Sequence, residues 1–129
     1  MKIASIEATT HVIPITPPLL DRPINRPIVF TKIETDTGIV GYGLTGAIQR
    51  FGAKELINRE LAPLLLGENP LETERLFDKC RLELNPRDQT GAWSSAVSAI
   101  DIALWDIKGK HFGEPVWRLL GGAHNPVPA

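Results

Sequence analysis

The sequence predicts an α+β fold in which a three-stranded antiparallel β-meander is followed by an antiparallel bundle of about three helices. Two observations predict this order. Up to Thr45 the apolar residues recur with a period of two, as on strands, and beyond residue 47 they recur at i, i+3 and i+4, as on helices. Strands that all precede the helices indicate an α+β fold, because α/β sheets alternate the two kinds of element.

The predicted sheet consists of three extended segments. Each places alternate residues on one face, namely Ile6, Ala8, Thr10 and Val12 in the first, Val29, Thr31 and Ile33 in the second, and Val40, Tyr42 and Leu44 in the third. Pro14 is expected to close the first segment. A turn is predicted at Thr35–Gly38, because Asp36 can bond its own backbone and Gly38 permits a positive φ.

The connection from Thr16 to Pro27 carries four prolines and the charged residues Asp21, Arg22 and Arg26. It is longer than the pairing of adjacent strands requires. Long loops often carry function, so the alternatives here are a functional loop and a plain surface loop.

Three helices are predicted beyond the sheet. Leu56, Ile57, Leu61 and Leu64 form the apolar face of the first, which Pro63 is expected to end or kink.

The second helix is predicted to start at Asn69–Glu72. Asn69 can cap it, Pro70 fits the first helical position, and Glu72 can reach back to the N–H of the cap. Its apolar face is formed by Thr73, Leu76, Phe77, Cys80 and Leu84, and Asn85 with Pro86 is expected to stop it.

The third helix is predicted from about Thr90 to Lys110. Its main apolar stripe is formed by Trp93, Ala96, Val97, Ile100, Leu104 and Ile107, and is widened by Ala92, Ala99, Ile102 and Ala103. A helix that is apolar most of the way round is expected to be buried on several sides.

Composition excludes several classes of partner. The 129 residues suit one domain, and a formal net charge of −1 provides no basic surface for nucleic acid or anionic lipid. Glu7 comes too early for the apolar region of a signal peptide, and no apolar run is long enough to span a membrane, so we expect a cytoplasmic protein. Cys80, the single cysteine, is interpreted as a small core residue.

The segment Gly41–Gly46 matches the G-x-G-x-x-G pattern of dinucleotide sites. It lies within a predicted strand of a meander, with no βαβ unit around it. The glycines are therefore interpreted as a bulge or as a place where another backbone packs closely, and nucleotide binding is the alternative.

The charged residues of the third helix suggest no catalytic centre. Lys110 suits the negative end of the helix dipole and lies four residues after Asp106, a favourable spacing for an ion pair. Asp101 and Asp106 are separated by about 140° around the helix, so they do not converge on one ligand. Each is expected to pair with Lys108, Lys110 or Trp105 nearby.

The three histidines lack the spacing of a metal site, and no hydrolase triad is visible. We therefore expect neither catalytic residues nor metal ligands in this chain.

The stretch Ala99–Lys110, followed by Gly113–Val116 and Leu119–Gly122, resembles the signature of the mandelate racemase and muconate-lactonizing branch of the enolase superfamily. The turn at Thr35–Gly38 and the glycines of Gly41–Gly43 agree with it in register. The resemblance extends over essentially the whole chain. One departure is Leu44, which stands where the family often has Glu.

The resemblance implies that residues 1–122 are an N-terminal capping (lid) domain and that residues 123–129 begin a TIM barrel that is truncated or absent here. It also implies a Mg²⁺-dependent racemase or dehydratase that removes a proton alpha to a carboxylate. The Mg²⁺ ligands and the Lys or His bases of the family lie on the barrel, outside this chain. The chain alone is therefore expected to be inactive.

The resemblance further implies that two loops of the lid, about Thr16–Pro27 and Gly46–Phe51, cover the substrate. The substrate-binding residues expected there are Arg22, Arg26, Ile48 and Arg50. Arginines favour a sugar acid over an apolar muconate. The expected partners are the C-terminal barrel of the parent chain, a sugar acid or other carboxylate, and further copies in a homo-oligomer. A stand-alone binding module without catalysis is the alternative.

Overall fold

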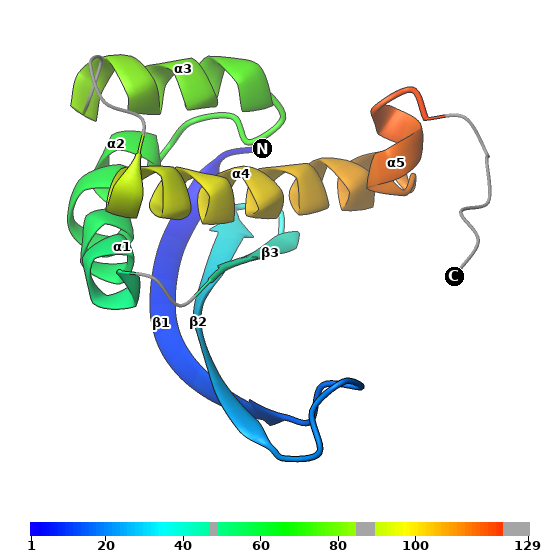
Figure 1. Ribbon diagram of the computed structural model, residues 1–129. Coiled ribbons are helices and arrows are strands. Elements are labelled where there is room, and N and C mark those ends of the chain that lie inside the picture. The colour runs from blue at the N-terminus through cyan, green and yellow to red at the C-terminus, as the bar shows by residue number, and fades with distance from the viewer. Residues whose placement is uncertain (47–48, 85–89, 123–129) are drawn as a thin grey trace.

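The computed structural model describes residues 1–46, 49–84 and 90–122. The chain forms a curved sheet with its helices on one face (Figure 1). The strands are β1 (Ile3–Ile15), β2 (Ile24–Thr35) and β3 (Val40–Thr45), and the helices are α1 (Arg50–Leu56), the π-helical segment η1 (Ile57–Leu61), α2 (Ala62–Leu65), α3 (Thr73–Leu84), α4 (Gly91–Phe112) and α5 (Val116–Leu119).

The three strands form one antiparallel sheet in the order β1-β2-β3, which confirms the predicted meander and the α+β class. Strand β3 pairs with only part of β2, from Val29 to Glu34. The remainder of β2 pairs with β1 alone, so the two long strands continue as a hairpin that projects beyond the helices (Figure 1).

The predicted loop Thr16–Pro27 begins at the predicted residue but ends earlier than predicted, and Pro14 does not close the first strand. Strand β1 runs through Pro14 to Ile15, and β2 resumes at Ile24, so Arg26 and Pro27 are strand residues. Pro27 lies opposite Val12, at a point where β3 no longer accompanies β2. Proline is tolerated there because its missing N–H interrupts no ladder hydrogen bond.

The outer edge of β1 is tied to the helices at Ala8. The Asn58 side chain of η1 accepts the Ala8 N–H at 2.8 Å and donates to the Ala8 carbonyl at 3.0 Å. The amide thus occupies the edge as a neighbouring strand would, and it protects that edge from pairing with another chain.

Helix α4 lies directly on β3, and two glycines permit the contact. A Cβ atom on Gly41 would lie 2.2 Å from the Ala103 carbonyl oxygen, and one on Gly43 would lie 1.9 Å from the Ala99 carbonyl oxygen. The close-packing interpretation of these glycines is therefore confirmed. Because this backbone faces a helix, it has no room for a pyrophosphate.

The first predicted helix consists of α1, η1 and α2. Pro63 lies in the first turn of α2, and the N–H of Ala62 binds the Ile57 carbonyl oxygen five residues back. A π-helical turn of this kind accommodates the bond that Pro63 cannot make. The helix ends at Leu65, two residues after Pro63, which agrees with the prediction that Pro63 would end or kink it.

Helix α3 starts later than predicted, at Thr73. Asn69 accepts the N–H of Leu71 at 3.2 Å, and its side-chain amide donates to Glu72 at 3.3 Å, so Glu72 does not return to the N–H of a cap. Pro70 is fully buried, which fixes Asn69–Glu72 as a separate turn ahead of the helix. Helix α3 ends at Leu84, and the predicted stop at residues 85 and 86 lies outside the described residues.

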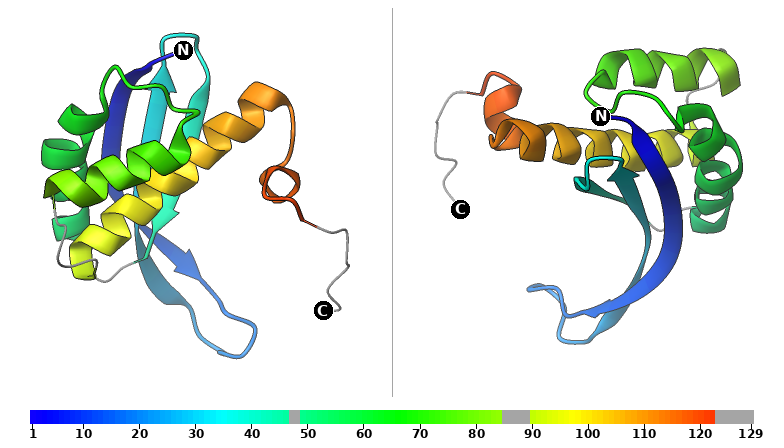
Figure 2. Two further views of the ribbon diagram at one scale, coloured as in Figure 1. Left: turned by 90° about the horizontal axis from the view of Figure 1, so that it is seen from above. Right: turned by 180° about the vertical axis from the view of Figure 1, so that it is seen from behind.

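Helix α4 is the buried helix that the sequence predicts. The six residues of its main stripe are all buried, and Figure 2 shows α3 packed across it on the side away from the sheet. Ile102 is an exception to the widened stripe, because 45% of its surface is exposed. None of the helices in the described parts of the chain is long and apolar enough to cross a membrane.

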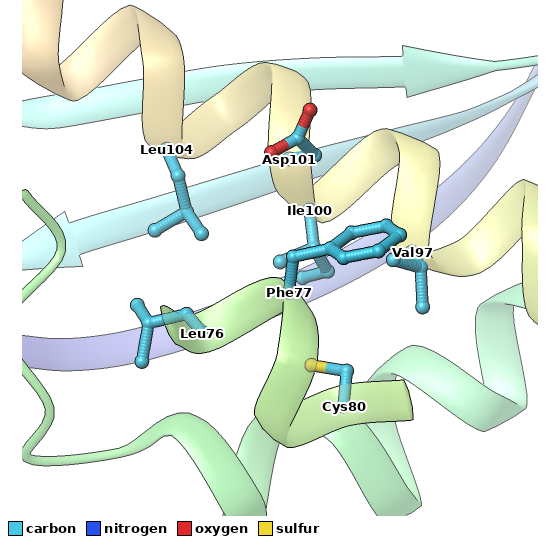
Figure 3. Close-up of a pocket in the computed structure, with 7 residues that line it drawn as sticks. All are labelled: Leu76, Phe77, Cys80, Val97, Ile100, Asp101 and Leu104. Carbon is cyan, nitrogen blue, oxygen red and sulfur yellow. The ribbon is translucent and has the colours of Figure 1, made fainter. Parts of the chain in front are cut away.

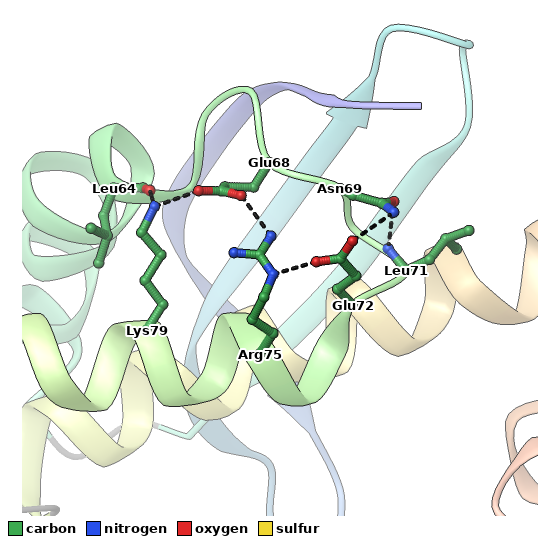
Figure 4. A network of polar contacts seen from close by, with 7 residues as sticks. All are labelled: Leu64, Glu68, Asn69, Leu71, Glu72, Arg75 and Lys79. Atoms are coloured by element: carbon green, nitrogen blue, oxygen red, sulfur yellow. Dashed lines mark hydrogen bonds and ion pairs between the residues drawn. The ribbon is translucent and has the colours of Figure 1, made fainter.

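A polar network joins the α2–α3 connection to α3 (Figure 4). Glu68 accepts Lys79 Nζ at 2.5 Å and Arg75 Nη2 at 2.6 Å, and Lys79 also donates to the Leu64 carbonyl at 2.9 Å. The hydrogen bond from Lys79, followed by that from Arg75, lowers the pKa of Glu68 from 4.5 to about 2.

The Glu68→Gln variant tests this network. The folded-state pKa of Glu68 lies below its ordinary value, so its contribution to stability is fully present above pH 4.5 and is lost as the pH falls toward about 2. In urea unfolding, we expect the stability difference between wild type and variant to be largest near pH 6 and to vanish near pH 2. Glu60→Gln, at an exposed site, is the control. A difference that does not change with pH would contradict this account.

The Gly43→Ala variant tests the contact between β3 and α4. Its Cβ would overlap the Ala99 carbonyl, so we expect the free energy of unfolding to fall by about 1–3 kcal/mol. Gly46→Ala is the matched control, because a Cβ there meets nothing within 4 Å. Equal stability of the two variants in urea unfolding would show that the backbones can separate at little cost.

Candidate functional site

The projecting hairpin holds two of the predicted substrate-binding residues. Arg22 lies in the bend between the strands, and Arg26 lies on β2 opposite Ile13. Both are exposed, and neither guanidinium has a hydrogen bond or ion pair to any described residue. Leu19, at the tip, is 96% exposed. The hairpin thus presents free cations and an uncovered apolar side chain away from the body of the domain.

The outer face of the hairpin is apolar and aromatic. The Phe30 ring stacks on Tyr42 with a centroid distance of 5.5 Å, and His11 meets Phe30 edge-on at 6.1 Å. An open hollow of about 380 Å³ lies here, lined by His11, Val12, Ile13, Ile28 and Phe30. The sequence analysis missed this surface. Its signal was the alternation of Phe30 with Val29, which places apolar residues on both faces of β2.

The second predicted loop joins β3 to α1. Ile48 lies outside the described residues. Arg50 begins α1, and its guanidinium lies over the Phe51 ring, 4.5 Å from the centroid. The start of α1 lies on the side of the body from which the hairpin projects (Figure 1). The described residues show no hydrogen bond, ion pair or ring contact between Arg50 and the hairpin arginines, and Arg50 contacts its neighbour Phe51 instead.

Gln49 is a feature of this loop that the sequence analysis missed. Its φ of 57° is the single positive value at a residue other than glycine in the described part of the chain. Its side chain lies against Gly91 at the start of α4, where a Cβ would come within 3.0 Å of Gln49 Oε1. Glutamine is not a usual residue for this conformation, so no sequence signal was available.

Leu44, the departure from the family pattern, is 54% exposed and lies opposite Phe30. It therefore extends the apolar surface of the sheet at a position where the family often has the carboxylate of Glu.

The predicted pairing of the helix α4 carboxylates is correct for one of the two. Asp106 accepts Lys110 Nζ at 2.6 Å and the N–H of Tyr42 at 2.9 Å. Asp101 forms no hydrogen bond or ion pair with any described residue, so its predicted pairing is wrong. Lys108 is turned away from it, because its Nζ lies 3.3 Å from Thr73 Oγ1 and 4.6 Å from the Trp105 ring centroid.

The groove between α3 and α4 is too small to be a ligand site (Figure 3). It encloses about 10 Å³, at most the room of one water molecule. Its walls are apolar, and the Asp101 carboxylate points away from Cys80. Cys80 is buried in the hydrophobic core, which confirms it as a core residue. Burial also raises the pKa of its thiol to about 11.

The described residues do not form a metal site. No group of three His, Cys, Asp or Glu side chains that could hold an ion occurs within residues 1–46, 49–84 and 90–122. The described residues therefore do not fit the Mg²⁺ that the resemblance implies.

Comparison with known proteins identifies the class to which this fold belongs. Residues 8–121 match the N-terminal domain of the mandelate racemase / muconate lactonizing enzyme family, so the chain belongs to that family.

The chain is 42% identical over 96 residues to the D-galactonate dehydratase of Klebsiella pneumoniae, covering 73% of this chain and 24% of that protein. It is 39% identical over 97 residues to the D-galactarolactone cycloisomerase of Agrobacterium fabrum, covering 75% of this chain and 25% of the relative. The chain thus spans about a quarter of the length of these relatives.

Among solved structures, the chain resembles a mandelate racemase/muconate lactonizing protein from Paracoccus denitrificans in complex with magnesium. The TM-score is 0.76 and the identity 33%, and the match covers 96% of this chain and 31% of the other. The expected relation to a family of magnesium-containing enzymes is therefore confirmed.

Substitutions at Gln49 test the strain in the second loop. Gln49→Gly is expected to raise the free energy of unfolding by up to about 1 kcal/mol, because glycine adopts a positive φ freely. Gln49→Val is expected to lower it by about 1–2 kcal/mol, since a β-branched residue is poorly tolerated there. Urea unfolding of both variants measures the order of their stabilities. A Gln49→Val variant more stable than Gln49→Gly would contradict the left-handed conformation.

Proposed function

We propose that this chain is the substrate-covering lid of a Mg²⁺-dependent enzyme that removes a proton alpha to the carboxylate of a sugar acid. The family match over residues 8–121 carries the proposal. The printed functions of the relatives support the substrate class, because they include a D-galactonate dehydratase and a D-galactarolactone cycloisomerase. Whether the parent enzyme racemises, dehydrates or cycloisomerises is left to the test below.

The lid acts by binding and by excluding water, and it is not catalytic by itself. The described residues contain no group of three His, Cys, Asp or Glu side chains that could hold an ion, which agrees with a lid that leaves metal binding to another domain. When bound, Mg²⁺ would stabilise the ene-diolate formed after proton removal, and its ligands are assigned to the domain that follows. The lid closes over the substrate and keeps water from the reacting carbon.

Arg22 and Arg26 are proposed to bind the hydroxyls or distal carboxylate of the substrate. Their free guanidinium groups on a projecting hairpin support this role, because they are available to a ligand. Arg50 and Ile48 are proposed to line the same site from the second loop. Leu19 adds apolar cover at the tip of the hairpin.

The assembly belongs to the same proposal. The partner is a barrel domain following residue 122, and the whole protein forms a homo-oligomer. The exposed apolar side chains of the hairpin support association. The cytoplasmic location expected from the sequence stays a prediction.

The function is tested by hydrogen exchange at the carbon beside the carboxylate. The full-length protein is incubated in D₂O with a panel of sugar acids that includes D-galactonate and D-galactarolactone, with Mg²⁺ or with EDTA. Deuterium uptake or turnover that requires Mg²⁺ is expected from the full-length protein and none from the 129-residue chain. Turnover by this chain alone, or exchange that is insensitive to EDTA, would overturn the proposal.

Arg22→Ala and Arg26→Ala in the full-length enzyme test the substrate-binding role. Each is expected to lower kcat/KM by about 10- to 100-fold, mainly through KM, because a charge-assisted hydrogen bond to the substrate is lost. Arg59→Ala is the control, since Arg59 is 78% exposed on η1 and pairs with Glu55. If both hairpin variants have the same kcat/KM as the control, Arg22 and Arg26 do not bind the substrate.

A further inference from the structure

Gln49 is the only residue other than glycine that has a left-handed backbone in the described part of the chain, with a φ of 57° and a ψ of 29°. A side chain makes this conformation unfavourable, because its Cβ crowds the following carbonyl oxygen. The conformation persists where the surrounding structure enforces it, and residues of this kind gather at functional sites. Gln49 directly precedes Arg50, the residue of the second loop that is proposed to line the substrate site.

Contacts of both its backbone and its side chain hold Gln49 in this conformation. Its carbonyl oxygen accepts the N–H of Ala53 at 2.9 Å, which closes the first turn of α1. Its side-chain oxygen lies against Gly91, the first residue of α4, where a Cβ would lie 3.0 Å from Oε1. Gly91 has a positive φ of its own, 64°, so two left-handed residues meet where α1 and α4 begin. An amide oxygen is favoured at this end of a helix, since the helix dipole is positive there.

The contact extends along the first turns of both helices. Gln49, Gly52 and Ala53 fall on one side of the first turn of α1, because they lie within about 100° of one another around the helix. A Cβ on Gly52 would lie 3.4 Å from the Cβ of Ala92, which places the two backbones close together, and Ala53 is fully buried. The start of α1 therefore lies directly against the start of α4.

Arg50 and Phe51 lie on the opposite side of the same turn. The Arg50 guanidinium lies over the Phe51 ring, 4.5 Å from its centroid, and Phe51 is 62% exposed. A right-handed Gln49 would differ in φ by about 120°, so the chain would enter α1 from another direction and the contact with Gly91 would be lost. The conformation of Gln49 thus fixes the turn that presents Arg50.

We propose that Gln49 is a positioning residue of the lid and that it acts on the substrate through Arg50. Its left-handed backbone and its contact with Gly91 hold the start of α1 in one place, so Arg50 meets the substrate already ordered. A side chain that is ordered in advance loses less conformational entropy on binding. The inference rests on the proposed function, since Arg50 has a substrate to meet only if the chain is a lid. It follows that relief of the strain at Gln49 makes the fold more stable and substrate binding weaker.

Two substitutions in the full-length enzyme separate the contact from the strain. Asparagine tolerates a left-handed backbone, so Gln49→Asn keeps the conformation and withdraws the side chain from Gly91. Gln49→Gly removes the side chain and also frees the backbone. The probe is the acid of the D₂O panel, D-galactonate and D-galactarolactone among them, that the wild-type enzyme turns over fastest. KM is expected to rise about threefold in Gln49→Asn and about tenfold in Gln49→Gly, with kcat changed by less than about twofold. Gln49→Gly is expected at the same time to resist urea better than the wild type.

The same substitution in an Arg50→Ala background tests whether Gln49 acts through Arg50. Gln49→Gly is expected to raise KM in the otherwise wild-type enzyme and to have no further effect on KM in Arg50→Ala, because the two residues then act as one unit. Glu60→Gly is the control. It loosens the backbone at an exposed helical residue of η1 and is expected to leave KM at the wild-type value.

A Gln49→Gly enzyme with the KM of the wild type would overturn the inference, and so would an equal rise in KM in the Arg50→Ala background. A Gln49→Gly enzyme that is less stable than the wild type would overturn the left-handed conformation and the inference with it. Each of these results leaves the lid function standing, because the wild-type enzyme still shows Mg²⁺-dependent turnover. A wild-type enzyme that turns over no sugar acid of the panel would instead overturn the proposed function.

Discussion

The rest of the structure depends on the direct contact between the backbones of β3 and α4. Where Gly41 and Gly43 lie against the carbonyls of Ala103 and Ala99, no side chain separates the sheet from the helix. This contact fixes the line along which the long helix crosses the sheet. It thereby sets the position of both ends of α4. The start of the helix lies beside Gln49 in the second loop, and its end lies beside α5.

The short length of β3 is the second constraint. Because β3 pairs only with Val29–Glu34, no third strand and no helix from the described residues covers the outer halves of β1 and β2. They form a two-stranded arm, and such an arm is only marginally stable without further contacts. An arm of this kind suits a lid, since it can close on a substrate and pack against another surface when it does. The helical part and the projecting arm are therefore two structurally distinct parts of the domain.

Several features could be predicted from the sequence because they depend on local patterns. Alternation predicted the meander, and the apolar stripe predicted α4. The glycines of Gly41–Gly46 predicted a close backbone approach, although the partner carbonyls required the structure. The family could be recognised from the ordered motif that begins at Ala99, and the family match confirms it. The two substrate-covering loops that the resemblance implies stay a prediction.

Other features depend on tertiary neighbours, and the sequence did not predict them. Pro27 is a strand residue because β3 ends before it reaches that point, which proline chemistry alone does not reveal. Helix α3 begins at Thr73 because Pro70 is buried in a separate turn. Asp101 lacks the expected cation because Lys108 turns to Thr73 and Trp105. The left-handed Gln49 has no local signal at all.

The central claim is that this chain is the lid of a larger enzyme of its family. The most direct measurement is the intact mass of the protein as its own cells produce it. A product longer by about 250 residues is predicted, because that is the length of a barrel domain. A native mass of 14.2 kDa would contradict the claim and would favour a binding module that acts without catalysis.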